Sequence, residues 1–315
     1  MLQRPGSPNG ISWYLYKVRR KLHVLRPLNS GDSEVKDHTH SGPGHLEYLT
    51  ILFNSTCIFL FSYLFVYILK EIVVVIAANG FNINTVITYH NIDFLIRSKD
   101  WTNEAVKVVY SVEPLFTLIL GFIALIFFSM TGKERWTLRL IMMWIFLQAF
   151  TQSLGAMIFG ILLNQESGWV LSYLYFDDST KLLIVIGLVL GMLVTGLFLS
   201  RFLLTTGNMY FNFLNKDNKM PFLISQILLP FIIGTWMIAL IKQPLLNFFE
   251  VFSEGSMLLI ICPAIIYARS SQELFFDEEP REIKFNWQWI IVSLLMLILF
   301  RVYFGQGIRL YESIF

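Results

Sequence analysis

Two glutamates four residues apart are the clearest candidates for chemistry in this sequence. Glu250 and Glu254 occur in the apolar stretch NFFEVFSEGSMLLI. A spacing of four places both carboxylates on one face of a helix, and like charges in a poorly solvated place tend to share a proton. The pair would therefore suit a proton relay or a cation site. Alternatively, because Lys242 and Pro244 lie just before it, the pair marks a helix start at the membrane surface, where acids favour the helix dipole.

A second charged pair, Lys70 and Glu71, interrupts a long apolar stretch. About 20 apolar residues precede the pair and IVVVIAA follows it, so we expect the helix to continue to about residue 77. Charges at membrane depth are costly and commonly functional. We therefore expect both side chains to face the bundle, with Lys70 paired to Glu113 or Glu250, and Glu71 paired to a Gln or Thr of the third span. The alternative is a helix that ends before the pair and leaves it among lipid headgroups.

Gln148 and Gln152 share one face of the third apolar stretch. Glutamines in membrane helices commonly form hydrogen bonds between helices, and we expect that role here. Small residues allow helices to pack closely. We expect such close helix packing at Gly155, Gly160, Gly187, Gly191 and Gly196.

The segment 79–109, between the first two apolar stretches, is about 30 residues long. Loops of this length usually carry local structure or function. It contains His90, Asp93, Asp100 and Glu104. These side chains form a candidate external site for a membrane-embedded enzyme acting on lipids, although three acids and one histidine are also ordinary for a loop.

The composition places these residues in a membrane. The chain has 315 residues, 55% of them hydrophobic and 15% charged, and soluble domains contain about one quarter charged residues. A spanning helix needs roughly 20 mostly apolar residues, and only helices satisfy their own backbone in lipid. The sequence predicts an all-α, polytopic bundle of about seven transmembrane helices, with six to eight compatible with the pattern. The windows are 47–69 (with a continuation to 78), 111–130, 137–163, 181–204, 220–241, 245–268 and 287–304.

Basic residues predict the orientation of the chain. With the N-terminus in the cytoplasm, 16 Lys and Arg residues fall on the cytoplasmic side and seven, Lys242 among them, on the other side. Lys and Arg are enriched in cytoplasmic loops. We therefore expect a multi-pass protein with its N-terminus inside and its C-terminus on the opposite side.

A cytoplasmic segment, residues 1–45, precedes the membrane domain, residues 46–315. Its stretch 11–28 alternates apolar and basic residues, as in a helix on an anionic membrane surface, although the charges could simply enforce orientation. The linker 29–45 contains His38, His40 and His45. These could bind a metal, but a Gly, Ser and Asp-rich loop favours a solvated role. We expect no cleavable signal peptide.

Several functions are disfavoured by what the sequence lacks. It contains no HExxH, GxSxG, P-loop or dinucleotide-binding motif. The net charge of +2 is too small to indicate nucleic acid. Cys57 and Cys262 lie in apolar stretches, as buried hydrophobic residues do. We expect no metal and no cofactor, and the lipid bilayer as the surrounding partner.

The stretch 70–85, KEIVVVIAANGFNINT, resembles the first motif helix of site-2-protease-like intramembrane zinc metalloproteases. Glu71, Ala78, Phe81 and Ile83 fall at corresponding places. About 30 residues later, EPLFTLILGFIAL resembles the family's GP-x-x-N helix through Pro114 and the leucine after it. The resemblance covers roughly residues 70–130 and implies a related arrangement of helices.

The residues that bind zinc in that family are missing here. Lys70 and Val74 occupy the two histidine positions, so Glu71, at the position of the general base, would have no zinc-bound water to activate. Glu113 and Thr117 replace the Gly and Asn of the second motif. The stretch 148–156, the only counterpart of the later Asp-containing motif by order, has no Asp. The resemblance thus implies a relative without zinc proteolysis.

Three functional hypotheses follow. The first is a non-catalytic relic of such a protease that binds another membrane protein or a lipid. The second is a transporter or channel-like protein that uses Glu250 and Glu254. The third is the lipid-modifying enzyme with the external site. The position of Lys70 and Glu71 best tests the first hypothesis. Burial among helices would support a relic site, whereas a position at the lipid headgroups would support a helix that simply ends near the pair.

Overall fold

The computed structural model describes residues 44–89, 91–132, 135–243, 248–276 and 283–310. The chain divides into two units, residues 1–41 and 42–315, and only the second is described here. The predicted surface helix 11–28 and the histidines His38 and His40 lie outside the described residues, as does most of the predicted N-terminal domain.

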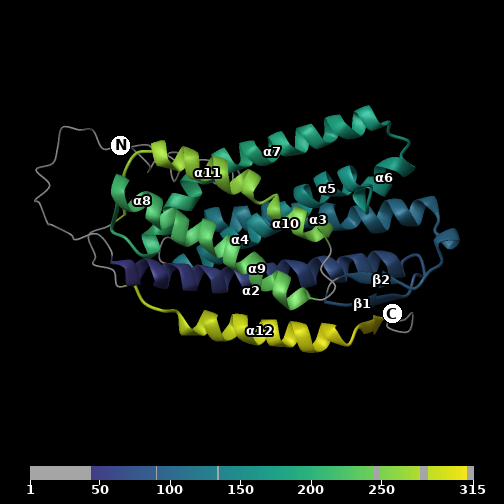
Figure 1. Cartoon of the computed structure of the whole chain (residues 1–315), viewed down its shortest axis with the longest axis horizontal. Coiled ribbons are helices and arrows are strands. Elements are labelled where there is room, and N and C mark those ends of the chain that lie inside the picture. The colour runs from purple at the N-terminus through teal and green to yellow at the C-terminus, as the bar shows by residue number, and fades with distance from the viewer. Residues whose placement is uncertain (1–43, 90, 133–134, 244–247, 277–282, 311–315) are drawn as a thin grey trace, which may run out of the picture. The chain divides into compact units, whose positions relative to one another are not determined.

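The seven predicted spans are confirmed: seven helical segments of the described chain are long and apolar enough to cross a membrane. The protein is an all-α helical bundle with small sheets added (Figure 1). The spans are α2 (His45–Asn79), α3 (Asn103–Met130), α4–α5 (Trp136–Leu163), α7 with its 3-10 extension (Asp178–Met209), α8–α9 (Lys216–Lys242), α10–α11 (Phe248–Ser270) and α12 (Trp287–Gly305). The short helix α6 (Ser167–Tyr173) joins the third span to the fourth.

Helix α2 is the central element of the bundle. It packs against α3, α4, α9 and α12, and α7 packs on the other side of the molecule against α11. With 35 residues, α2 is roughly 50 Å long at 1.5 Å per residue, which exceeds the hydrocarbon thickness of about 30 Å. As predicted, it continues past Lys70 and Glu71, and it ends only at Asn79.

Two of the spans contain a turn of π-helix. Thr151–Gly155 separates α4 (Trp136–Phe150) from α5 (Ala156–Leu163), and Ile224–Leu228 separates α8 (Lys216–Leu223) from α9 (Leu229–Lys242). A π-turn inserts one residue into the helix and is frequently found at functional sites. The first of them contains Gln152 and the second contains Gln226.

A three-stranded sheet closes one end of the bundle, which the sequence analysis did not predict. Strands β1 (Thr85–Ile87) and β2 (Ile92–Phe94) form an antiparallel hairpin, and β5 (Ile308–Leu310) pairs with the free side of β1. The last span therefore ends beside the segment that follows the first span. This is expected for seven spans, because the first and the last span then end at the same side of the bundle. At the other end, β3 (Phe213–Leu214) pairs with β4 (Leu274–Phe275).

The buried apolar side chains form two clusters. The larger one runs through the bundle and includes Phe59, Trp144 and Phe231. The smaller one, which we call the end cluster, lies under the sheet and consists of Val74, Val75, Ala78, Ile83, Ile87, Ile92, Ala105 and Val109. Along α2, Lys70 and Glu71 fall between the two clusters, so apolar packing encloses these charges from both ends.

Close helix packing at glycine is confirmed at three of the five predicted positions. A Cβ on Gly155 would collide with Ser256, one on Gly160 with Ser167, and one on Gly196 with the carbonyl of Ile260. The prediction was wrong for Gly187 and Gly191, because no atom lies within 4 Å of a Cβ there. Those two glycines are on the outward face of α7, where apolar side chains of the described chain are also exposed.

Candidate functional site

Lys70 joins α2 to α3 through an ion pair. Its Nζ lies 2.6 Å from Oε1 of Glu113 and 3.7 Å from Oε1 of Glu71. Glu71 is 5% exposed, and the Lys70 and Glu113 side chains are 17% and 18% exposed. The predicted pairing with Glu113 is confirmed, and the alternative in which the helix ends before Lys70 is wrong, because α2 continues to Asn79.

The backbone near Glu113 is held by hydroxyl groups. Pro114 lies one turn above Thr117 inside α3, and the Thr117 hydroxyl donates to the Glu113 carbonyl at 2.9 Å. Ser153, in the π-turn of the third span, donates to the carbonyl of Pro114 at 2.7 Å. These bonds fix α3 against the third span at the level of the ion pair.

A second ion pair joins α9 to α10 (Phe248–Gly255). Lys242 Nζ lies 2.9 Å from Oε2 of Glu250, and Lys242 is only 2% exposed. The ammonium also lies 4.5 Å from the ring centre of Tyr67 and 5.7 Å from that of Tyr63. Cation–π contacts of this kind are strongest where water is excluded. Lys242, which the sequence analysis counted on the side opposite the N-terminus, is the last residue of α9 and a buried partner of Glu250.

Glu254 follows Glu250 by one turn and contacts the third span. Nε2 of Gln152 lies 3.5 Å from its Oε1. The expected interhelical hydrogen bond of Gln152 is thus observed. The partner predicted for Glu71 was wrong, because no Gln or Thr of the third span bonds to it among the described residues, and its ion-pair partner is Lys70.

Glu166 is a member of the site that the sequence analysis missed. It precedes α6, and the packing of α6 against α3 and α5 brings it to the cluster. The Trp169 ring meets that of Tyr110 edge to face at 5.1 Å, which anchors α6. Burial, and then the nearby charge of Glu113, raise the pKa of Glu166 to about 8. Its only sequence signal was an acid in the short polar stretch NQES between two apolar stretches.

The backbone of Glu166 is strained. Its φ is 42° and its ψ is −101°, outside the regions that residues with a Cβ normally adopt. Strain of this kind costs on the order of 1–3 kcal/mol and concentrates at functional sites. The conformation places the first turn of α6 directly after it, with the Glu166 carbonyl accepting from the backbone N–H of Trp169 at 3.0 Å.

All these groups line one small cavity, of about 40 Å³. We call its charged members the carboxylate cluster: Glu71, Glu113, Glu166, Glu250 and Glu254, with Lys70 and Lys242. Tyr63, Tyr67 and Gln152 complete the polar wall. A volume of this size holds about one water molecule, so a proton or a small cation fits and an organic substrate does not.

The cluster contains three more acids than bases. Each unpaired charge in a buried place costs several kcal/mol, and such groups usually take up a proton instead. The two short ion pairs involve Glu113 and Glu250. Glu71 has only the longer contact of 3.7 Å to Lys70, and neither Glu166 nor Glu254 forms an ion pair with a described residue. No three His, Cys, Asp or Glu side chains in the described ranges lie close enough together to hold a metal ion.

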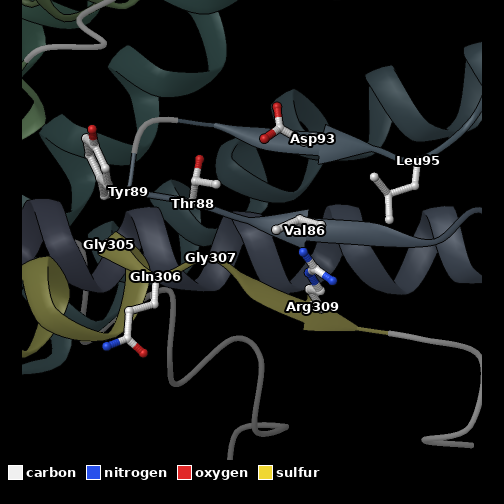
Figure 2. Close-up of a pocket in the computed structure, with 9 residues that line it drawn as sticks. All are labelled: Val86, Thr88, Tyr89, Asp93, Leu95, Gly305, Gln306, Gly307 and Arg309. Carbon is white, nitrogen blue, oxygen red and sulfur yellow. The ribbon is translucent and has the colours of Figure 1, made fainter.

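The residues of the predicted external site do not form a cluster like the carboxylate cluster. His90 lies outside the described residues. Asp93, Asp100 and Glu104 are all exposed. Among the loop acids only Asp93 lines the larger cavity of about 550 Å³ beside the sheet (Figure 2). Asp93 and Arg309 both lie opposite Val86, on either side of β1.

Gln148 has no hydrogen-bond partner among the described residues, although it is fully buried. The expected interhelical bond of Gln148 was therefore wrong. The two motif segments of the protease resemblance do meet, because Lys70 and Glu113 form the ion pair described above.

No family model, curated protein or solved structure matches this chain. The resemblance to site-2-protease-like proteins stays a prediction.

Proposed function

We propose that this chain is a membrane transport protein that moves protons, alone or coupled to a solute, through the carboxylate cluster. The observation that supports this best is the excess of three acids over bases on one small cavity, lined mainly by residues of membrane-spanning helices. Ionisable groups at membrane depth are retained mainly on ion and proton pathways. The small volume of the cavity favours a proton over a larger ligand.

The cluster contains carboxylates in short ion pairs and carboxylates without a close cation. Lys70 and Lys242 form ion pairs with Glu113 and Glu250 at 2.6 and 2.9 Å. Glu254 has an amide neighbour rather than a cation, so it can lose and regain a proton at lower cost. Burial raises the pKa of Glu166 to about 8, and the residue keeps partial exposure, which suits a group that exchanges protons with water.

A flux assay tests this function. The purified protein is reconstituted in liposomes that contain a pH-sensitive dye, and proton flux is followed after a pH step. The double variant Glu250→Gln and Glu254→Gln is expected to lower the flux at least ten-fold. The matched control is Glu104→Gln, the same change at an exposed acid, which is expected to leave the flux unchanged. Equal flux in the wild type and the double variant would contradict the proposal.

A second candidate is the non-catalytic relic that binds a membrane protein or lipid. It is favoured by the ion pair between Lys70, at the place of a zinc ligand in the resembling family, and Glu113. A lysine ammonium there would occupy the position of the metal charge. The metal content of the purified protein tests this idea, and one zinc ion per chain bound by residues 70–120 would overturn it.

We also propose that the N-terminus is cytoplasmic and the C-terminus is on the other side. The support is the excess of basic residues, 16 against seven, on the side of the N-terminus. The carboxylate cluster then lies in the outer half of the membrane. Protease accessibility of tags fused to each end, in intact cells and in inverted vesicles, would test the orientation.

A further inference from the structure

Below the carboxylate cluster, the core of the bundle contains buried polar side chains that lack partners. Within the described chain, no hydrogen bond reaches Ser62 Oγ, Thr151 Oγ1, Oε1 of Gln152, or either side-chain polar atom of Gln148 and Gln226. All five side chains are buried or nearly so. We call these five residues the polar column.

Contacts and helix geometry place the column along the inner face of α2. Trp144 Nε1 donates to Ser55 Oγ at 3.0 Å, and Ser55 donates to the backbone carbonyl of Gln226 at 2.6 Å. These bonds set α2, α4 and the second π-turn at one level. Gln148 is one turn beyond Trp144 on the same face of α4, and Ser62 is two turns beyond Ser55 on α2.

The column leads into the carboxylate cluster. Gln152 is one turn beyond Gln148 and reaches Glu254 at 3.5 Å. Fifteen residues of α2 separate Ser55 from Lys70, which corresponds to roughly 22 Å along the helix axis. Together with the cluster, the column and the hydrogen bonds at Ser55 extend over a length that approaches the hydrocarbon thickness of about 30 Å.

The opposite end of the column also contains polar groups. Asn54, next to Ser55, donates to the backbone carbonyl of Lys284 at 2.9 Å and accepts from the backbone N–H of Asn286 at 2.9 Å. Asn208 has a buried side-chain oxygen without a partner in the described chain, and the Tyr210 hydroxyl lies near the Asn54 side chain. Polar groups thus continue to the end of the bundle where α2 begins.

We propose that the polar column is a path of ordered water that carries protons between the carboxylate cluster and the end of the bundle where α2 begins. This inference rests on the proposed function. Buried polar groups in native proteins are almost always hydrogen-bonded, and bound water is the usual partner when protein groups are missing. Both π-turns contribute a glutamine to the column, and π-turns are frequently found at functional sites.

The column is built for water rather than for a metal ion. Its groups are neutral amides and hydroxyls that both donate and accept hydrogen bonds. A water molecule between such groups can reorient as a proton passes. A bare cation would leave the N–H and O–H donors of these side chains without acceptors. A dry column would instead leave seven polar atoms buried without partners, each at a cost in folding free energy.

Water-edited solid-state NMR in lipid bilayers tests the hydration directly. The side-chain amides of glutamine and the backbone amides of alanine are labelled with ¹⁵N, and the signals of Gln148, Gln226 and Ala149 are assigned by their loss in Gln148→Leu, Gln226→Leu and Ala149→Gly. Magnetisation from water is expected to reach the amides of Gln148 and Gln226 several-fold faster than the backbone N–H of Ala149. Ala149 is a dry reference on the same helix, fully buried against Gly121. Transfer to Gln148 as slow as to Ala149 would overturn the water path.

Proton flux in liposomes tests the conduction. Gln148→Leu removes two unpartnered polar atoms, so the variant is expected to fold at least as stably as the wild type while its flux falls at least ten-fold. Leu147→Met, a volume-conserving apolar change at a buried neighbour, is expected to conduct normally. Proton flux with a dry Gln148 would overturn the path alone. A hydrated Gln148 without any flux in the wild type would overturn the path and the proposed function together.

Discussion

The ion pair between Lys70 and Glu113 can be measured as a coupling free energy. At 2.6 Å and an effective dielectric constant of about 20, Coulomb's law gives roughly 6 kcal/mol before desolvation is counted. The two side chains are 17% and 18% exposed, and both lose hydration, so we expect a net coupling of about 2–4 kcal/mol. Removal of Lys70 alone leaves Glu113 and Glu71 without their cation and is expected to cost about 3–5 kcal/mol.

The assay is a double-mutant cycle. The free energy of unfolding in mixed micelles is measured for the wild type, Lys70→Met, Glu113→Gln and the double variant, and the interaction term is taken from the four values. The double variant is expected to recover most of the stability that Lys70→Met loses. A coupling below about 0.5 kcal/mol, typical of an exposed pair, would show that water reaches the pair freely and would refute the reasoning from burial.

Two further predictions concern single elements. Burial raises the pKa of Glu166 from 4.5 to about 8, so the folded state binds that proton more tightly than the unfolded state does. The wild type therefore loses stability as pH rises between those two values. Glu166→Gln is expected to remove about 1–3 kcal/mol of this pH dependence, measured by thermal unfolding at about pH 5 and about pH 9. An equal pH dependence in both proteins would contradict the assignment. Gly196→Ala is expected to destabilise the bundle by about 1–3 kcal/mol because its Cβ meets the Ile260 carbonyl, whereas Gly191→Ala, with open space around it, is expected to be neutral in the same unfolding assay. Equal effects of the two changes would contradict the packing.

The proposed function assigns different tasks to the two kinds of buried polar group. The carboxylate cluster holds charge and is therefore built from ion pairs that stay formed. The polar column holds none, and its unpartnered amides tolerate rearrangement. The double variant of Glu250 and Glu254 and the variant Gln148→Leu should therefore both lower flux, while only the first alters the charge of the site.

The sequence alone determined the spans, because a helix in lipid is limited by length and hydropathy, which are local properties. It also identified most of the site. Lys70, Glu71, Glu113, Glu250 and Glu254 are conspicuous because a charge is rare in an apolar stretch. The pairing of Lys70 with Glu113 followed from the need of a buried cation for a carboxylate.

Tertiary structure decided what local composition cannot specify. Glu166 joins the site because α6 packs against α3, and Lys242 is buried because α9 ends beside Tyr67. Gln148 and Gln152 have the same type and the same helix face, yet only Gln152 finds a partner. Their difference depends on which neighbouring helix lies at each level. Contacts between helices far apart in sequence determine which residues lie side by side. The pattern within a single helix therefore cannot predict which of the two glutamines has a partner.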